Sequence, residues 1–164
     1  GVLVNANGGR RPQLRIDGVP VGQEITDLQP ESHRDGSFVI VIATDAPLVY
    51  RQLLQLAKRA AFGLARTGTP STVSSGDFAI AFSTANIIPD RTEDGTFSIK
   101  ILSNNRMDAL YQAVVEATEE SIINAMTTAV TMVGKNGNTI YAIPLERLQA
   151  IMKKYGRLVS TVKH

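Results

Sequence analysis

The sequence has no cysteine among its 164 residues and only two histidines, His33 and His164. The absence of cysteine excludes a thiol nucleophile, a thiolate metal site and a disulfide framework. A Ser-His-Asp triad within this sequence would have to use His33, which lies in a charged segment where we expect a loop. We therefore predict neither a histidine-based catalytic site nor a bound metal or cofactor, and any hydrolytic base must be another group.

Long hydrophobic segments and a large charge of one sign are also absent. The longest apolar runs are too short to cross a bilayer, and no signal-peptide pattern is visible. The net charge of +2 is too small to indicate a nucleic-acid partner. With 43% hydrophobic residues, the composition is that of a globular domain. We expect a cytoplasmic protein, with the periplasm as the alternative, that binds neither membranes nor nucleic acids.

The hydrophobic pattern predicts strands and helices along the sequence. Strands are expected at 2–7, 38–43, 78–84, 97–102 and 139–143, and helices at 47–66, at 106–132 and from Pro144 onward. The turn signals Gly8-Gly9 and Asp17-Gly18 make the first 22 residues resemble a β-hairpin or two adjacent strands. Residues 23–36 are charged and show no apolar period, so we expect them to form an exposed linker.

Gly36 and Ser37 stand where this linker meets the apolar run 38–43. A serine hydroxyl is a poor nucleophile unless a base lies within hydrogen-bond reach. If the Gly36–Ser37 peptide bond is cut, Ser37 gains a free α-amino group that titrates near neutral pH and can act as that base. The same residues also fit a simple turn, in which Ser37 only begins a strand.

Two other places carry polar residues that could assist such a nucleophile. Ser75 and Asp77 flank Gly76 just before the expected strand 78–84. If that strand lies beside 38–43, both side chains arrive near Ser37 and could orient its amine and relay its proton. Asn7 ends the first expected strand and could donate a hydrogen bond to a developing oxyanion. Alternatively, Asn5 and Asn7 could cap the following turn through their own backbone.

Several motifs, taken in order, resemble one known family. They are Val2-Leu3-Val4-Asn5-Ala6-Asn7-Gly8, Gly18-Val19-Pro20-Val21-Gly22, Asp35-Gly36-Ser37, Ala43-Thr44-Asp45-Ala46-Pro47-Leu48, Arg59-Ala60-Ala61-Phe62-Gly63-Leu64-Ala65-Arg66-Thr67-Gly68, Ser75-Gly76-Asp77 and Ala81-Phe82-Ser83-Thr84-Ala85-Asn86. Together they are similar to the L-aminopeptidase/D-esterase and β-aminopeptidase family, over nearly all of the sequence.

The resemblance implies a precursor that cuts itself between Gly36 and Ser37. It implies an α/β fold, a four-layer α/β/β/α sandwich of the N-terminal-nucleophile type, of which this sequence would form the C-terminal portion. Residues 1–36 would end the first subunit and 37–164 would form the second, within one domain. By position, Ser37 would be the nucleophile, Ser75 its hydroxyl partner, Asp77 the carboxylate and Asn7 the oxyanion donor.

The resemblance also implies an activity and partners. Members remove N-terminal residues from small peptides, amides or esters without a metal, as homo-oligomers of the cut protomer that include the N-terminal remainder of the same precursor. Asp77 departs from the family pattern, which usually has the longer glutamate there, and a tyrosine of the family site is expected in an earlier segment.

Two other functions stay open. The chain could be a non-catalytic α/β scaffold or interaction subunit that retains the fold. It could also be an acyltransferase that uses the same nucleophile. Related acyltransferases of this fold generally have threonine at the position of Ser37, which favours the hydrolase.

Overall fold

Three strands form the main sheet of the computed structural model, which describes residues 1–30 and 36–158. β1 (Val2–Asn7) runs antiparallel to β2 (Ser37–Thr44), and β3 (Phe78–Ser83) runs parallel to β2 on its other side. The β-branched and apolar run of β2 suits a central strand. The expected strands 2–7, 38–43 and 78–84 are confirmed to within one residue at each end.

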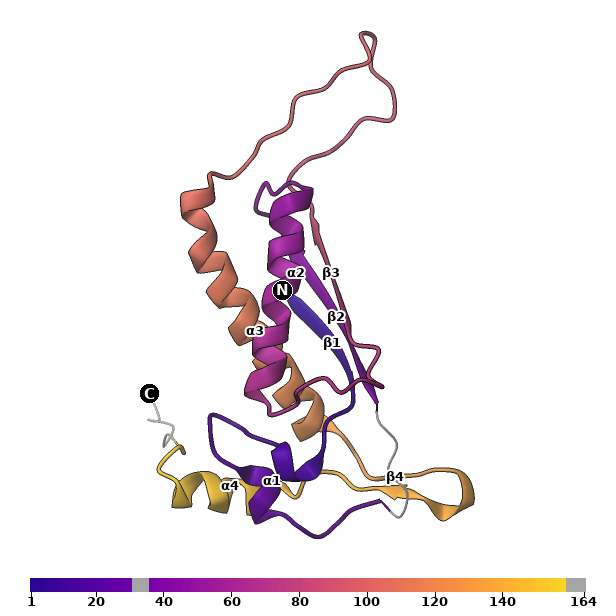
Figure 1. Ribbon diagram of the computed structural model, residues 1–164, viewed down its shortest axis with the longest axis vertical. Helices are drawn as coiled ribbons and strands as arrows, with labels where there is room; N and C mark the ends of the chain where they lie inside the picture. The colour runs from indigo at the N-terminus through magenta and orange to yellow at the C-terminus, as the bar shows by residue number, and fades with distance from the viewer. Residues whose placement is uncertain (31–35, 159–164) are drawn as a thin grey trace.

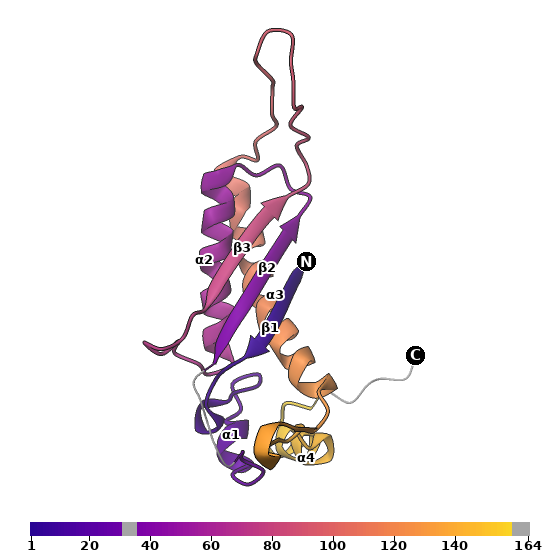
Figure 2. The ribbon, with the colours of Figure 1, turned by 90° about the vertical axis from the view of Figure 1, so that its right-hand side faces the viewer.

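One face of this sheet is covered by two long helices, α2 (Tyr50–Arg66) and α3 (Met107–Thr128), as Figures 1 and 2 show. α2 begins three residues after Pro47, where the Gln52 side chain accepts a hydrogen bond from the Val49 N–H. α3 ends four residues before the expected end, because the backbone becomes extended at Ala129. The side chains between helices and sheet form the main core: Phe38, Ile40, Ile42, Leu48, Leu56, Ala60, Leu64, Met107, Val114 and Ile122.

The opposite face of the sheet is apolar and is left open by the described residues. Side chains alternate across a strand, so Phe38, Ile40 and Ile42 point toward the helices while their neighbours point away. On the open face Leu3 is 71% exposed and Ile80 is 54% exposed. The unbroken apolar run of β2 is typical of a strand covered on both faces, but the described residues cover only one. A sheet with two apolar faces requires a further layer on the second.

A second, smaller core lies beyond the end of the sheet where β2 begins (Figure 1). It is built by η1 (Arg11–Gln13), α1 (Val21–Glu24) and α4 (Leu145–Lys154) with the chain between them. Its buried side chains are Ile16, Val19, Val21, Ile25, Leu148, Ile151 and Met152. Pro144 precedes α4, as the sequence predicted.

The prediction of a hairpin in the first 22 residues is wrong. β1 pairs with β2, and only an isolated bridge between Ile16 and Val19 forms within the segment. Pro12 and Pro20 lack the N–H groups that a hairpin ladder needs. The apolar side chains of this segment are buried against α4 instead.

The linker 23–36 is only partly the exposed loop that the sequence predicted. Glu24 ends α1, and Ile25 is only 1% exposed in the smaller core, so the prediction is wrong for the start of this segment. The Arg11 guanidinium donates hydrogen bonds to the carbonyl oxygens of Ile25, Asp27 and Leu28. Residues 26–30 are an exposed to half-buried loop, as the sequence predicted, and residues 31–35, which include His33, lie outside the described residues.

Residues 86–102 form a long arm that projects past the other end of the sheet (Figures 1 and 2). Gly95 lies at its turn with φ of 73°. The Asn86 side chain bridges the arm, because its amide donates to the Lys100 carbonyl and its oxygen accepts from the Lys100 N–H, both at 2.9 Å. The expected return strand 97–102 does not form, because no strand of the described chain pairs with it.

The remaining elements are short. η2 (Asn104–Arg106) leads into α3, and η3 (Lys135–Gly137) lies between the two-residue strands β4 (Met132–Val133) and β5 (Thr139–Ile140), which pair antiparallel. The expected strand 139–143 is therefore reduced to two residues. No helix within residues 1–30 and 36–158 has the length and apolar character needed to span a bilayer.

Candidate active site

The site forms where β2 and β3 begin side by side. In this parallel pair Val39 lies opposite Phe78. The same offset of 39 residues continues upstream, so that Gly36 meets Ser75, Ser37 meets Gly76 and Phe38 meets Asp77. The loop before β3 therefore brings its polar residues to the Gly36–Ser37 junction.

Three hydrogen bonds join these pairs in succession. The Ser75 hydroxyl donates to the Gly36 carbonyl oxygen at 3.1 Å. The Ser37 hydroxyl oxygen accepts from the Gly76 N–H at 2.9 Å. The Asp77 carboxylate accepts from the Phe38 N–H through Oδ1 at 2.7 Å. One residue of the same loop thus holds each of three groups: the carbonyl before Ser37, the Ser37 hydroxyl and the amide after Ser37.

Asp77 is a charged group in partly buried surroundings. Burial of this carboxyl acts to raise its pKa, but hydrogen bonds from the Ser71 and Ser75 hydroxyls and from the Phe38 N–H outweigh burial and hold the pKa below its usual value. Ser75 donates to Gly36 in the structure, so its bond to Asp77 is an alternative use of the same proton. Oδ2 of Asp77 is buried, and no atom of the described residues is placed to bond to it. The lowered pKa keeps the carboxylate ionised at neutral pH.

Gly36 is glycine because two backbones approach closely. A methyl group on Gly36 would lie 1.7 Å from the Asn7 carbonyl oxygen and 3.0 Å from the Gly8 Cα. The reason for glycine at this position is therefore space. The end of β1 therefore packs directly against the Gly36–Ser37 junction.

Asn7 lies directly opposite Ser37 in the antiparallel β1–β2 pair. Side chains opposite one another in such a pair project from the same face of the sheet, with Cβ atoms about 4.5–5.5 Å apart. The Asn7 amide is therefore on the same open face as the Ser37 hydroxyl. No hydrogen bond joins the Asn7 and Ser37 side chains, and Asn5 lies two pairs further along the ladder, opposite Val39.

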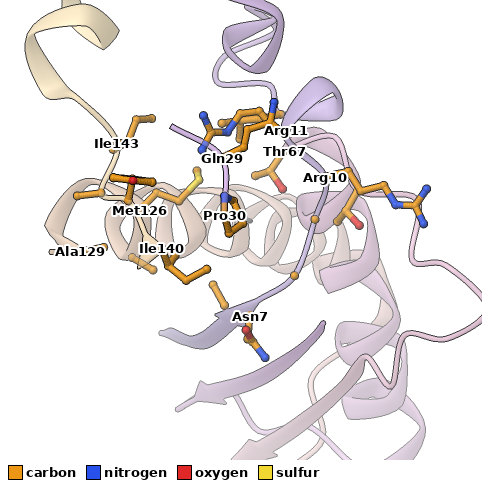
Figure 3. Close-up of a pocket in the computed structure, with 18 of the residues that line it drawn as sticks. Asn7, Arg10, Arg11, Gln29, Pro30, Thr67, Met126, Ala129, Ile140 and Ile143 are labelled. Carbon is orange, nitrogen blue, oxygen red and sulfur yellow. The ribbon is translucent and has the colours of Figure 1, made fainter. Parts of the chain in front are cut away.

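A cavity lies elsewhere, between the end of α3, the loop after β1 and the segment around β5 (Figure 3). It measures about 1140 Å³, and Met126, Ile140 and Ile143 contribute to its lining. Asn7 borders it, but Figure 3 shows the Asn7 amide pointing away from the other lining side chains. Ser37, Ser75 and Asp77 do not line it. Three of the four site residues expected from the sequence, Ser37, Ser75 and Asp77, therefore meet at the strand junction and not in this cavity.

Sequence reasoning missed the backbone donors of the site. The N–H groups of Gly76 and Phe38 carry two of the three contacts, and a backbone donor has no residue type to reveal it. Ser71, whose hydroxyl acts on Asp77, stands in a small-residue loop with φ of 53°, and its position could not be inferred from composition. In the part of the chain that the structure describes, no three acidic or histidine side chains are grouped to hold a metal ion.

Comparison with solved structures defines the class of fold. The chain superimposes on the L-aminopeptidase D-Ala-esterase/amidase of Ochrobactrum anthropi with a TM-score of 0.89 and 43% identity, over 96% of this chain and 44% of that one. That enzyme is described as a prototype for the serine aminopeptidases and a variant of the Ntn hydrolase fold. A β-aminopeptidase of Burkholderia sp. gives a TM-score of 0.82 at 35% identity, over 94% and 44% of the two chains. The chain therefore has part of an Ntn hydrolase fold, and its described residues supply the main three-stranded sheet and the helical layer on one face of it.

Sequence comparison then gives the family. Residues 1–140 match peptidase family S58. The β-peptidyl aminopeptidase BapA of Sphingosinicella microcystinivorans is 41% identical over 175 residues, which cover 98% of this chain and 44% of that protein. The chain belongs to peptidase family S58, and the resemblance seen in the sequence is confirmed. It spans less than half the length of these relatives.

Proposed function

We propose that the protein containing this chain is a serine aminopeptidase or amidase that cuts itself between Gly36 and Ser37 and then uses Ser37 as its nucleophile. The observation that carries the proposal is the run of three contacts from residues 75–77 to residues 36–38. If Ser37 merely began a strand after a turn, these hydrogen bonds to the Gly36 carbonyl, to the Ser37 hydroxyl oxygen and from the Phe38 amide would not be required. Membership of a peptidase family supports the same conclusion.

In the precursor, the Ser37 hydroxyl oxygen attacks the Gly36 carbonyl carbon. Negative charge then develops on the Gly36 oxygen, where the Ser75 hydroxyl already donates a hydrogen bond. The C–N bond breaks as Ser37 nitrogen takes a proton, which leaves an ester between Gly36 and the Ser37 oxygen. Water hydrolyses this ester and frees the α-amino group.

In the mature enzyme, the same hydroxyl attacks the substrate carbonyl, and the α-amine of Ser37 takes its proton. Asp77 acts one residue away from that amine, because it holds the Phe38 N–H. The shorter carboxylate thus fixes the backbone next to the nucleophile through Oδ1, while Oδ2 is buried without a hydrogen-bond donor among the described residues. Asn7 is the candidate donor to the substrate oxyanion, since it projects from the face that carries Ser37.

The open face of the sheet supports a partner for this chain. We infer that its exposed apolar side chains, such as Leu3, Ile80 and Phe82, pack against the N-terminal remainder of the same precursor. That layer would complete the four-layer sandwich, with residues 1–36 ending the first subunit and 37–164 forming the second. Homo-oligomeric assembly and a cytoplasmic location stay predictions.

The relatives suggest the substrates. A β-peptidyl aminopeptidase and an L-aminopeptidase with esterase and amidase activity are the matched proteins. We infer that this protein hydrolyses N-terminal aminoacyl peptides, amides or esters. The alternatives are a non-catalytic scaffold that keeps the fold and an acyltransferase with the same nucleophile.

Substitution Ser37→Ala in the complete protein tests the proposal, with Ser98→Ala on the exposed arm as the matched control. We expect Ser37→Ala to remain one polypeptide by intact mass under denaturing conditions and to turn over no aminoacyl amide, while Ser98→Ala gives two fragments and full activity. Two fragments from Ser37→Ala would disprove the nucleophile. An uncut, inactive parent protein would favour the scaffold, and product formation only with an added amine acceptor would favour the acyltransferase.

A further inference from the structure

A second, small cavity of about 10 Å³ adjoins the Gly36–Ser37 junction. Gly36 and Ser75 line it, together with Gln13, Thr69 and Thr72. A site of this volume is at the lower limit for a single water molecule, and a buried water also needs two to four polar partners. The carbonyl, hydroxyl and amide groups of the lining meet that need, so the cavity suits one water molecule and nothing larger.

Gln13 supplies the acceptor that such a water needs. Its side-chain Oε1 is buried, and none of the described residues donates a hydrogen bond to it. A buried carbonyl oxygen is expected to have a donor, and ordered water commonly provides one. The Gln13 backbone is held in η1 by its N–H bond to the Arg10 carbonyl at 2.9 Å. The close approach of Gly68, where a methyl group would lie 1.7 Å from the Gln13 carbonyl oxygen, fixes it further.

We propose that this cavity binds the water molecule that completes self-cleavage, with Gln13 Oε1 accepting a hydrogen bond from it beside Gly36. The inference rests on the proposed self-cleavage at Gly36–Ser37 and adds the group that positions its second reactant. In the ester, the water oxygen forms a bond to the Gly36 carbonyl carbon, and the bond from that carbon to the Ser37 oxygen breaks. One water proton goes to the Ser37 oxygen. The carboxylic acid formed on Gly36 gives its proton to the free amine of Ser37, which balances the reaction. Gln13 is a positioning residue, because it acts through the water.

The test uses the complete protein and follows the appearance of the two fragments by intact mass. Gln13→Met removes the acceptor oxygen at similar volume, and we expect fragments to appear about tenfold more slowly, as suits the loss of one hydrogen bond. Hydroxylamine attacks the ester directly, so it should restore the rate in Gln13→Met and leave a hydroxamate on Gly36. Gln13→Glu keeps an acceptor oxygen and should cleave at close to the parent rate. Gln23→Met makes the same change on the exposed side of α1 and is the control.

Two results would overturn the inference while leaving the proposed function intact. One is cleavage of Gln13→Met at the rate of Gln23→Met. The other is cleavage that is equally slow with and without hydroxylamine, which would show that Gln13 acts on folding or on the first acyl shift. If the parent protein does not cut at this bond at all, the proposed function fails and the water site fails with it.

Discussion

Replacement of Gly36 by alanine tests whether the close approach of β1 fixes the cleavage junction. The added methyl group would lie 1.7 Å from the Asn7 carbonyl oxygen and 2.6 Å from its carbonyl carbon. Real Cβ atoms essentially never come within 3.0 Å of such atoms, so the two backbones must separate by roughly 1 Å or more. Because both atoms belong to the backbone, no side-chain rotation relieves the clash.

The separation has two measurable consequences. Overpacking of this kind costs about 1–3 kcal/mol of folding free energy. It also displaces the Gly36 carbonyl from the Ser75 hydroxyl and the Ser37 oxygen, and a misplacement of about 1 Å slows an aligned reaction by about a hundredfold. We therefore expect Gly36→Ala to unfold at lower denaturant concentration and to yield its two fragments about a hundredfold more slowly.

Intact mass over time gives the cleavage rate, and urea unfolding of the uncut chain gives the stability. Gly134→Ala is the control, because a methyl group there meets only the Asn138 carbonyl oxygen at 3.4 Å, an ordinary contact. Gly36→Ala that cleaves and unfolds like Gly134→Ala would refute the argument from space.

Three further predictions follow from the same structure. Ser75→Ala removes the donor to the Gly36 oxygen and should slow fragment formation by on the order of a hundredfold, and an unchanged rate by mass would exclude this role. Folding lowers the pKa of the Asp77 carboxyl, so the ionised carboxylate stabilises the folded state at pH values above its pKa in the unfolded chain. This stabilisation is lost as pH falls through its pKa in the folded chain. Asp77→Asn should therefore lose less stability than the parent as pH falls below about 4 in urea titrations, and parallel losses would contradict this. Gly63→Ala should destabilise the α2–α3 contact, because the added methyl group would lie 2.5 Å from the Val115 carbonyl oxygen. Overpacking costs about 1–3 kcal/mol, which we expect to outweigh the gain of about 1 kcal/mol in helix propensity. A raised melting temperature would show that the helices can part.

The local sequence determined most of the elements. The apolar runs fixed the three strands of the main sheet to within one residue, and the helix expected at 47–66 ends at Arg66 as predicted. Strand and helix periods are local properties, since they depend on side chains a few residues apart. The sequence also placed Ser75 and Asp77 near Ser37, on the condition that their strands were neighbours.

Tertiary structure decided everything that depends on which segments meet. The turn signals near Gly8 and Asp17 favoured a local hairpin, but β1 pairs with β2 across a gap of some thirty residues, and the segment between them is buried against α4. The arm 86–102 has a strand-like pattern without a neighbouring strand, so its pattern alone could not make it one. Pairing over such distances is selected by the whole core, which no local pattern contains.

The site shows the same division. Sequence by itself determined the chemical groups, a hydroxyl after glycine and a hydroxyl and carboxylate around a second glycine. Only the parallel register of β2 and β3 decided that Asp77 holds the Phe38 amide and that Ser75 reaches the Gly36 carbonyl. Only the packing of β1 showed that Gly36 has no room for a side chain. Residue types determine which reactions are possible. The distances between atoms of residues that are far apart in the sequence are determined only when the sheet forms.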